Sequence, residues 1–425
     1  MTAIAGRSTT AHLARLSRDQ ATWSTAVDVF AILLAVALPF STSLVAIFAL
    51  AMLVAMGPTL DVEAFLRTLK RPVAAVPVAL FSLAVIGTLW SDAPWGTRLY
   101  AILPTVKLLV LPFLFYHFER SERGMAIFVA FLVSCMLLAA LSWIVAYDPA
   151  FTLKPAGEAT RGIFVKNYID QSQEFTLCAV ALAYPIITLV RAKKIPQALL
   201  LAAIAVGLVL TMTFVIVSRT ALVTMPIMLA VFALMHLTRR TNLAILALAI
   251  VVAGIAWIAS PQLEHTVSTF KRDYQLYEEN GTSTSIGERL EYWQKSLRFF
   301  VDAPVIGHGT GSTRGLFEQA ATGPAVLAAG KVINNPHNQT LNAAVQWGTV
   351  GVAVLFAMWL LHLLLFRGGG LANWIGLLVV VQNIFTSLFN SHIFDFHEGW
   401  MYVLGVGIAG GMVLKARSTE LGAGR

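Results

Sequence analysis

Long apolar stretches recur along almost the whole chain and leave little choice of fold. A helix needs roughly 17 to 25 apolar residues to cross a bilayer. Apolar residues make up 57% of the chain and charged residues 12%, a balance unlike that of soluble domains. The sequence therefore predicts an all-α polytopic membrane protein. About twelve transmembrane helices are expected, at residues 24–40, 44–56, 73–90, 102–117, 125–147, 172–190, 197–217, 220–237, 243–258, 342–366, 371–389 and 397–414.

The basic residues predict the orientation of these spans. Lysine and arginine are held in short loops on the cytoplasmic side, and here they gather before the first span, in alternate short loops and after the last span. Both termini are then cytoplasmic. This placement accounts for most of the net charge of +8, so nucleic-acid binding has no support. Cys135 and Cys178 lie in apolar stretches, which gives no disulfide framework and no CxxC metal signature.

One long polar interval, residues 261–341, interrupts the apolar chain. It predicts four regions: nine spans with short loops in residues 1–260, a large loop in 261–341, three spans in 342–414 and a cytoplasmic tail in 415–425. The orientation places the large loop in the periplasm or outside the cell.

The large loop contains the pattern of an amphipathic helix. Ser285-Ile286-Gly287-Glu288 reads as a capping box with Ser285 as N-cap, so a helix is expected from Ile286. An apolar stripe follows at helical spacing, and we expect it to pack onto the membrane domain. The stripe consists of Leu290, Trp293, Leu297, Phe300 and Val301. The next turn, Gly307-His308-Gly309-Thr310-Gly311, lacks the P-loop spacing, and His308 is interpreted as a turn residue.

The polar interval ends on a histidine next to an apolar helix. Asn335 is a good N-cap and Pro336 a good first helical residue, which places His337 in the first turn. The positive end of the helix dipole opposes an imidazolium there, so a neutral ring that accepts a proton is expected. The alternative is that His337 merely caps or packs. Asn338, Asn342 and Gln346 then follow at four-residue spacing, a polar line that bonds neighbouring helices or lines a cavity.

Two arginines have the placement of phosphate ligands. Ser218-Arg219-Thr220 joins two predicted spans with almost no loop, so the guanidinium is held near the outer membrane boundary. Its planar fork matches phosphate oxygens and keeps its charge. Arg289 lies in the first turn of the amphipathic helix, where unpaired N–H groups help to hold an anion. The competing interpretation of Arg219 is a snorkelling anchor for a helix end.

Other polar groups on the outer side have two interpretations each. Lys107 lies within a predicted span and either snorkels to the surface or lines a polar cavity. Arg161 and Lys166, in the outer loop 148–170, fit a phosphate or sugar ligand or an ordinary solvated loop. Residues 390–398 crowd two histidines and two acids together. Their spacing matches no strong metal pattern, so a polar turn beneath the site is favoured.

Taken in order, these features resemble the O-antigen ligases. The features are the twelve spans, the Ser218-Arg219-Thr220 junction, the outer loop with its helix and glycine turn, and the Pro336-His337-Asn338 run ending at Leu341-Asn342. The wider superfamily includes O-antigen polymerases and protein O-oligosaccharyltransferases. The resemblance implies a GT-C-like glycosyltransferase of the bacterial inner membrane with its active site facing the periplasm. The donor is undecaprenyl diphosphate-linked O-antigen, the acceptor is lipid A-core, and no metal or other cofactor is required.

The resemblance also assigns roles to residues. His337 matches the essential histidine, and Arg219 and Arg289 match the arginines that bind the diphosphate. We expect Arg161 and Lys107 to add to diphosphate binding, and Asn338, Asn342 and Ser218 to support the site. The reaction expected is an inverting transfer with His337 as general base. Alternatives are a polymerase or a protein O-oligosaccharyltransferase that uses the same donor, or a transporter of lipid-linked oligosaccharides. A transporter favours Gly/Pro-broken helices in matching positions, and Pro185 and Pro226 are not in matching register.

Overall fold

All regular secondary structure in the described part of the chain is helical. The computed structural model describes residues 19–154, 162–237 and 257–423, together with isolated residues between 240 and 255. Within them, 10 segments are long and apolar enough to cross a membrane, and one further apolar helix, Leu371–Thr386, is shorter. The all-α polytopic class is therefore confirmed. The predicted ninth span, 243–258, falls largely outside the described residues, so the count of twelve stays a prediction.

The helices follow the predicted spans, with boundaries shifted by a few residues. The first half contains α2 (Gln20–Ala37), α3 (Thr42–Met56), α4 (Val62–Leu69), α5 (Pro72–Ile86), α6 (Trp95–Val106), α7 (Val110–Phe118), α8 (Gly124–Tyr147), α10 (Tyr168–Ala181), α11 (Ala183–Arg191), α12 (Ile195–Phe214) and α13 (Arg219–His236). The polar interval forms α15 (Pro261–Asn280), α16 (Ser285–Asp302) and α17 (Thr313–Gln319). The last helices are α18 (Gln339–Leu365), α19 (Leu371–Thr386) and α20 (Phe396–Ala423).

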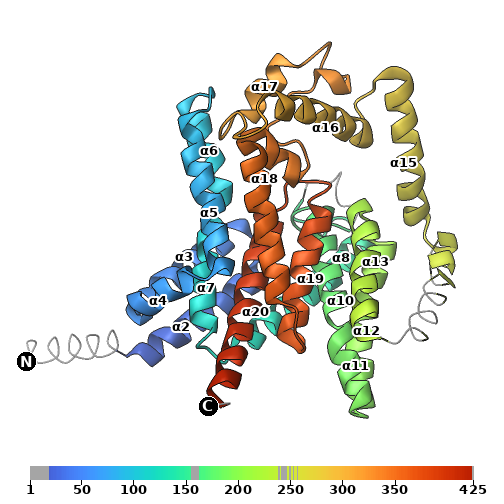
Figure 1. The fold of residues 1–425 in the computed structure, drawn as a ribbon. Coiled ribbons are helices and arrows are strands. Elements are labelled where there is room, and N and C mark those ends of the chain that lie inside the picture. Colours follow the sequence, from blue (N-terminus) through green and yellow to red (C-terminus); the bar gives the residue numbers. More distant parts are fainter. Residues whose placement is uncertain are drawn as a thin grey trace, which may run out of the picture.

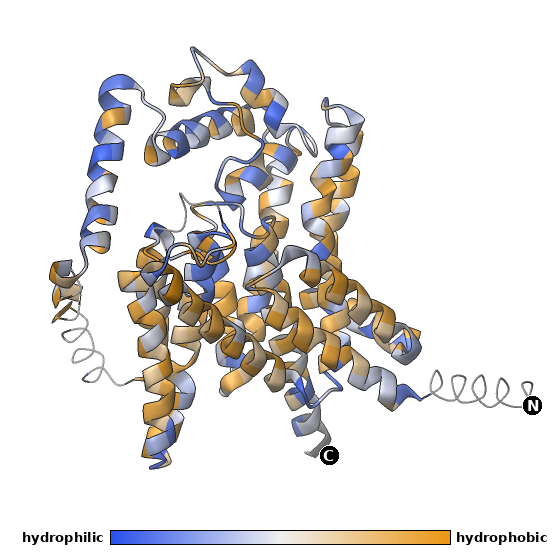
Figure 2. Ribbon diagram, turned by 180° about the vertical axis from the view of Figure 1, so that it is seen from behind, coloured by the Kyte–Doolittle hydropathy of each residue, from blue (hydrophilic) through white to orange (hydrophobic). Residues whose placement is uncertain are grey.

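The apolar helices form one bundle, and the polar interval covers one end of it. Helix α2 begins and α20 ends at the opposite end from α16 and α17 (Figure 1). Helix α15 stands beside the bundle and leads up to α16. Hydrophobic residues dominate the bundle, whereas α15 and α16 carry many hydrophilic ones (Figure 2). This separation of apolar and polar elements agrees with a membrane domain and an extramembrane cap.

Glycine brings α20 close to α7 at the centre of the bundle. A Cβ atom at Gly407 would lie 2.6 Å from Leu114 Cβ, and one at Gly411 would lie 2.6 Å from Phe118 Cβ. Small residues at helix contacts allow the close approach that gives membrane helices their packing energy. These contacts make the central helix pair a rigid support for the loop that precedes α20.

A break in α18 anchors the glycine turn of the polar interval. Gly348 has φ 60° inside the helix, a conformation that favours glycine. The break leaves carbonyl groups near it without helical partners. Those of Val345 and Gln346 accept hydrogen bonds from the N–H groups of His308 (2.9 Å) and Gly309 (2.8 Å). His308 also bonds the Phe299 carbonyl through Nε2 at 2.8 Å, so it is a turn residue here.

Helix α16 starts one residue earlier than predicted. Its N-cap is Thr284, whose hydroxyl accepts the Gly287 N–H at 3.2 Å. Ser285 is the first helical residue, so the predicted capping box is wrong. Thr284 is the N-cap because its side chain is placed to accept an N–H of the first turn.

The face of α16 that packs is also different from the predicted stripe. Tyr292, Ser296 and Phe299 are buried, whereas Leu297 is 53% exposed and Val301 72% exposed. Phe299 packs edge-to-face on Phe317 of α17 at 5.3 Å between ring centroids. The stripe prediction is wrong because Leu297 and Val301 lie on the exposed side of the helix. The aromatic face of Tyr292 and Phe299 meets the cap and α18 instead.

Candidate functional site

A cavity of about 620 Å³ lies where several helices begin. The first residues of α10, α13, α15 and α16 all line it, and so does Phe389 of the loop after α19. Free N–H groups and the positive end of the dipole make each helix start attractive to an anion. Candidate membrane spans begin with α10 and with α13, and another span ends with α12. The residues that follow α12 also line the cavity. The cavity therefore lies at the end of the membrane domain and combines several helix starts, which favour an anion.

Arg219 is the first residue of α13 and lines this cavity. Its Nη1 donates to Asp273 Oδ2 at 2.9 Å and its Nη2 to Thr269 Oγ1 at 2.5 Å. The guanidinium also lies over the ring of Phe270, 4.6 Å from the centroid. Three residues of α15 thus hold the fork toward the cavity. Ser218 before it lines the cavity and is 2% exposed, and its buried hydroxyl has no partner among the described residues.

Arg289 enters the same cavity from α16. Its Nη1 donates to Ser285 Oγ at 3.0 Å, and no carboxylate of the described residues lies within salt-bridge distance of it. Burial lowers the pKa of the Arg289 guanidinium, and the nearby charge of Arg219 lowers it further. Two arginines therefore face one cavity with Asp273 as the only carboxylate paired to either of them in the described structure. A bound polyanion would relieve their repulsion.

His337 lies beside the cavity wall but does not line the cavity itself. Its ring stacks on Tyr292 of α16, at 5.9 Å between centroids with an angle of 25°. Its Nδ1 lies 2.9 Å from Asn390 Oδ1. Nothing in the described part of the chain hydrogen-bonds to its Nε2. One ring nitrogen is therefore held, and the other is available.

The predicted helical environment of His337 is wrong. Helix α18 begins at Gln339 with Asn338 as N-cap, and Asn338 Oδ1 accepts the Leu341 N–H at 3.0 Å. His337 has φ 52°, which does not fit a helix. Asn335 Oδ1 accepts the His337 N–H at 2.9 Å and so closes a local turn. Burial lowers the pKa of His337, and Arg289 lowers it further, so the neutral ring comes from desolvation and a neighbouring cation.

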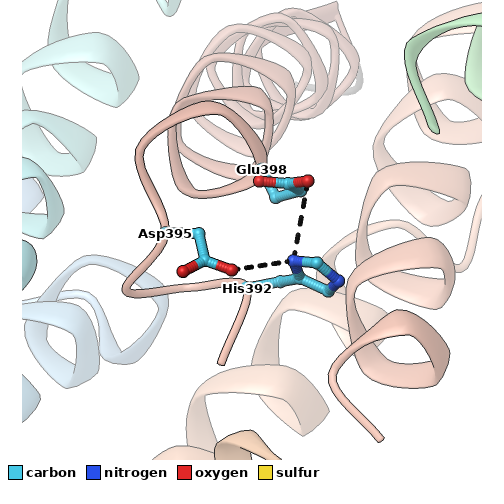
Figure 3. Close-up of side chains that lie close together, drawn as sticks. All are labelled: His392, Asp395 and Glu398. Carbon is cyan, nitrogen blue, oxygen red and sulfur yellow. Dashed lines mark ion pairs between the residues drawn. The ribbon is translucent and has the colours of Figure 1, made fainter. Parts of the chain in front are cut away.

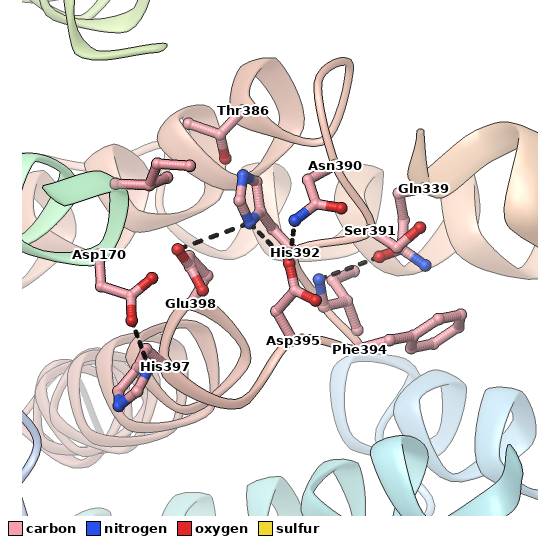
Figure 4. A network of polar contacts seen from close by, with 12 residues as sticks. Asp170, Gln339, Thr386, Asn390, Ser391, His392, Phe394, Asp395, His397 and Glu398 are labelled. Atoms are coloured by element: carbon pink, nitrogen blue, oxygen red, sulfur yellow. Dashed lines mark hydrogen bonds and ion pairs between the residues drawn. The ribbon is translucent and has the colours of Figure 1, made fainter. Parts of the chain in front are cut away.

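A polar network continues from Asn390 into the bundle. Asn390 Nδ2 donates to Asp395 Oδ2 at 2.6 Å, and the same carboxylate oxygen faces His392 (Figure 4). His392 Nδ1 lies 3.2 Å from Asp395 Oδ2 and 3.6 Å from Glu398 Oε1 (Figure 3). Burial opposes a charged ring, but Glu398 and Asp395 prevail and raise the pKa of His392 to about 9. The 390–398 segment is the polar turn beneath the site that the sequence favoured.

The same turn contains the only described group of residues close enough to hold a metal ion. One ligand atom each of His392, Asp395 and Glu398 lies within 4.8 Å of the others. A protonated His392 carries one positive charge between the two carboxylates and offsets the charge of one of them. The arrangement therefore fits an ion-pair cluster as well as a metal site.

The structure separates Lys107 and Lys166 from the cavity. Lys107 Nζ donates to the main-chain carbonyls of Asp395 and Phe394, so Lys107 neither snorkels nor reaches the cavity. Lys166 Nζ donates to the Leu38 carbonyl. Arg161 lies outside the described residues.

Asn342 ties α18 to its neighbours. Its Nδ2 donates to Ser391 Oγ at 2.9 Å and its Oδ1 accepts from Gln346 at 2.6 Å. Gln346 in turn accepts the Gly311 N–H at 2.9 Å. The polar line of α18 therefore bonds neighbouring segments, one of the two predicted outcomes. Asn338 acts as a cap.

Several residues of the site gave no clear signal in the sequence. Asp273 and Thr269 lie on α15 at a four-residue spacing with Phe270 between them, which is an ordinary pattern for a solvated helix. Tyr292 was passed over because the predicted stripe excluded it. Asn390 was seen only as part of a polar turn. An amide beside two acids and two histidines indicates a role in the site only when the structure places it next to His337.

Comparison with known proteins is consistent with this site. The family model described as O-Antigen ligase matches residues 204–356, an interval that contains Arg219, Arg289 and His337. An uncharacterized protein of Haemophilus influenzae is 30% identical over 118 residues, which are 27% of this chain and 30% of that protein. The chain thus matches less than a third of that relative's length.

Proposed function

Because the chain belongs to the O-antigen ligase superfamily, we propose that it transfers O-antigen polysaccharide from undecaprenyl diphosphate to lipid A-core. The transfer takes place at the periplasmic face of the bacterial inner membrane. The observation that carries the proposal is the cavity where four helices begin and which Arg219 and Arg289 both line, with His337 beside its wall.

The cavity suits the head of a lipid-linked glycan. Its volume of about 620 Å³ is within the ~300 to 1,000 Å³ of typical small-molecule sites. A lipid diphosphate in the bilayer would present its phosphates at the end of the membrane spans, where the helix starts and arginines lie. The glycan would then extend away from the membrane. Only the ends of two large lipid-linked molecules need to meet in such a site.

The proposed reaction is a single displacement. The acceptor hydroxyl of lipid A-core attacks the anomeric carbon of the donor, and the bond from that carbon to the diphosphate oxygen breaks. His337 Nε2 takes the proton of the hydroxyl. Arg219, Arg289 and the helix N–H groups stabilise the negative charge that develops on the leaving diphosphate. One displacement inverts the anomeric carbon, so an alpha-linked donor gives a beta-linked product.

Arginines take the place that a metal ion has in many diphosphate sites. Magnesium is normally bound by one or two carboxylates beside substrate phosphates. Asp273 is the carboxylate bonded to a cavity arginine in the described structure, and it is already paired with Arg219. We therefore propose a metal-independent transfer.

The test is transfer in vitro by the purified full chain. Donor and acceptor are supplied with excess chelator, and the linkage of the product is read by NMR. A beta-linked product formed in chelator supports the proposal. Loss of activity on chelation, or an alpha-linked product from an alpha-linked donor, contradicts the metal-free inverting mechanism.

A deletion strain separates the ligase from the related activities. Loss of all polysaccharide-bearing lipopolysaccharide with intact lipid-linked polymer indicates a ligase. Core with a single repeat indicates a polymerase, and unaltered lipopolysaccharide with unglycosylated proteins indicates a protein O-oligosaccharyltransferase. Donor trapped on the cytoplasmic face indicates a transporter.

A further inference from the structure

The hydrogen bonds around Asn390 identify which of its side-chain atoms faces His337. The main-chain N–H of His337 donates to one side-chain atom of Asn335 at 2.9 Å, so that atom is oxygen. The other atom of Asn335 is then its NH2 group, which donates to Asn390 at 3.2 Å. The atom of Asn390 that receives this bond must accept, so it is Oδ1. The same Oδ1 lies 2.9 Å from His337 Nδ1.

The opposite side of Asn390 gives the same answer independently. Its other side-chain atom lies 2.6 Å from Asp395 Oδ2. An ionised carboxylate only accepts hydrogen bonds, so the atom that faces it is the NH2 group. Asp395 Oδ2 also faces His392 Nδ1 at 3.2 Å, a position in which a carboxylate oxygen acts as an acceptor. Two anchors, Asn335 and Asp395, therefore hold the amide of Asn390 in one orientation.

We propose that Asn390 is a positioning residue that fixes the tautomer of His337. Because Asn390 Oδ1 only accepts, His337 carries its proton on Nδ1, and the lone pair is on Nε2. Stacking on Tyr292 holds the plane of the ring. The inference rests on the proposed function only in that the lone pair on Nε2 serves as the base.

An amide at this position has a consequence that a carboxylate would not have. It orients the ring without placing a negative charge beside it, so the imidazole stays neutral. The charged groups around His337 are Arg289 and Glu288 of α16 and Asp395 of the turn. Asp395 acts on His337 through the amide, one link away. Moving its charge onto residue 390 would stabilise the imidazolium directly.

The test exchanges the two side chains in the full-length protein, Asn390→Asp with Asp395→Asn, and compares it with Asn390→Ala. The titration of His337 is followed by hydrogen–deuterium exchange at its ring carbon, read by mass spectrometry. We expect the midpoint to rise by about one pH unit in the exchanged protein and to fall in Asn390→Ala, which loses the acceptor. Asn373→Ala is the matched control, since Asn373 bonds Gly369 at the other end of α18 and α19, and it should leave the midpoint unchanged.

The second readout is turnover with purified donor and acceptor. Asn390→Ala is expected to lower kcat by about 10-fold to 100-fold with KM changed less than about threefold, because the ring remains present but unoriented. The exchanged protein should recover turnover above its raised midpoint. An unchanged midpoint in both variants overturns the proposal whether or not the protein is a ligase. Shifted midpoints in a protein without ligase activity leave the tautomer assignment standing and contradict the proposed function.

Discussion

Arg219 of α13 donates through Nη1 to Asp273 Oδ2 of α15 at 2.9 Å. The pair joins the membrane bundle to the first helix of the polar interval. In the described structure, Asp273 is the carboxylate that bonds a cavity arginine. It therefore competes for Arg219 with any anion that enters the cavity.

Removing the charge of Asp273 should strengthen donor binding. Asp273→Asn keeps an oxygen that accepts from Arg219 but removes the competing charge. The pair is partly exposed, and such pairs are worth roughly 0.2 to 1 kcal/mol. The KM for the donor should then fall by up to about fivefold, as measured by initial rates at fixed acceptor. Asp302→Asn, at the far end of α16, is the charge-matched control, and a raised KM in Asp273→Asn would show that the carboxylate aids binding instead.

Arg219→Lys should be severely impaired although it keeps the charge. The lysine loses the planar fork that allows two parallel hydrogen bonds to phosphate oxygens. Removal of one oriented donor from a developing oxyanion typically costs about 10² to 10³ in rate, so kcat/KM is expected to fall by about that range. Arg314→Lys, whose partner is Glu318 on the exposed face of α17, should have wild-type kinetics. Full activity of Arg219→Lys would reduce Arg219 to a membrane anchor.

His337→Ala should retain donor binding and lose turnover. General base assistance is typically worth ~10² to 10⁴ in rate, so kcat should fall by at least that range with donor affinity measured separately. His265→Ala is the control, because His265 lines the cavity without a proposed role. Near-normal turnover of His337→Ala would remove the histidine from the mechanism.

The pH dependence should report the lowered pKa of His337. A general base works when it is deprotonated, so activity is constant near neutral pH and falls as the pH drops through that pKa. The acid limb of kcat/KM is expected below pH 6.5, the ordinary value for histidine. An acid limb above that value would mean that the ring is stabilised as a cation.

The packing of α16 should depend on Phe299 and tolerate change at Leu297. Phe299 is 8% exposed and Leu297 53% exposed. Phe299→Asp buries an unpaired charge between α16 and α17 and should lower the melting temperature and abolish transfer. Leu297→Asp should leave both near wild type, because exposed substitutions usually change stability by about 0.5 kcal/mol or less. The measurements are thermal unfolding in detergent and transfer activity, and equal damage by both changes would contradict the observed face.

The sequence by itself determined the fold class of the protein and identified the two arginines of its candidate site. Long apolar runs predict helices across a membrane because no other open structure satisfies the backbone there. Arg219 was recognised because a cation is disfavoured on the outer side of the membrane, and Arg289 because it lies in the first turn of the predicted amphipathic helix. Such signals depend on composition and short spacings, which are readable along the chain.

The tertiary structure alone decided which groups meet. That Arg219 pairs with Asp273, and that Asn390 bonds His337 across 53 residues, depends on how distant helices pack. Helix α18 also begins later than the sequence predicted. The turn closed by Asn335 and the left-handed backbone conformation of His337 override the local preference of Pro336 for a helix start. Local propensity is a weak preference that tertiary contacts overcome. The physical reason is that hydrogen bonds between distant segments have no spacing in the sequence to reveal them.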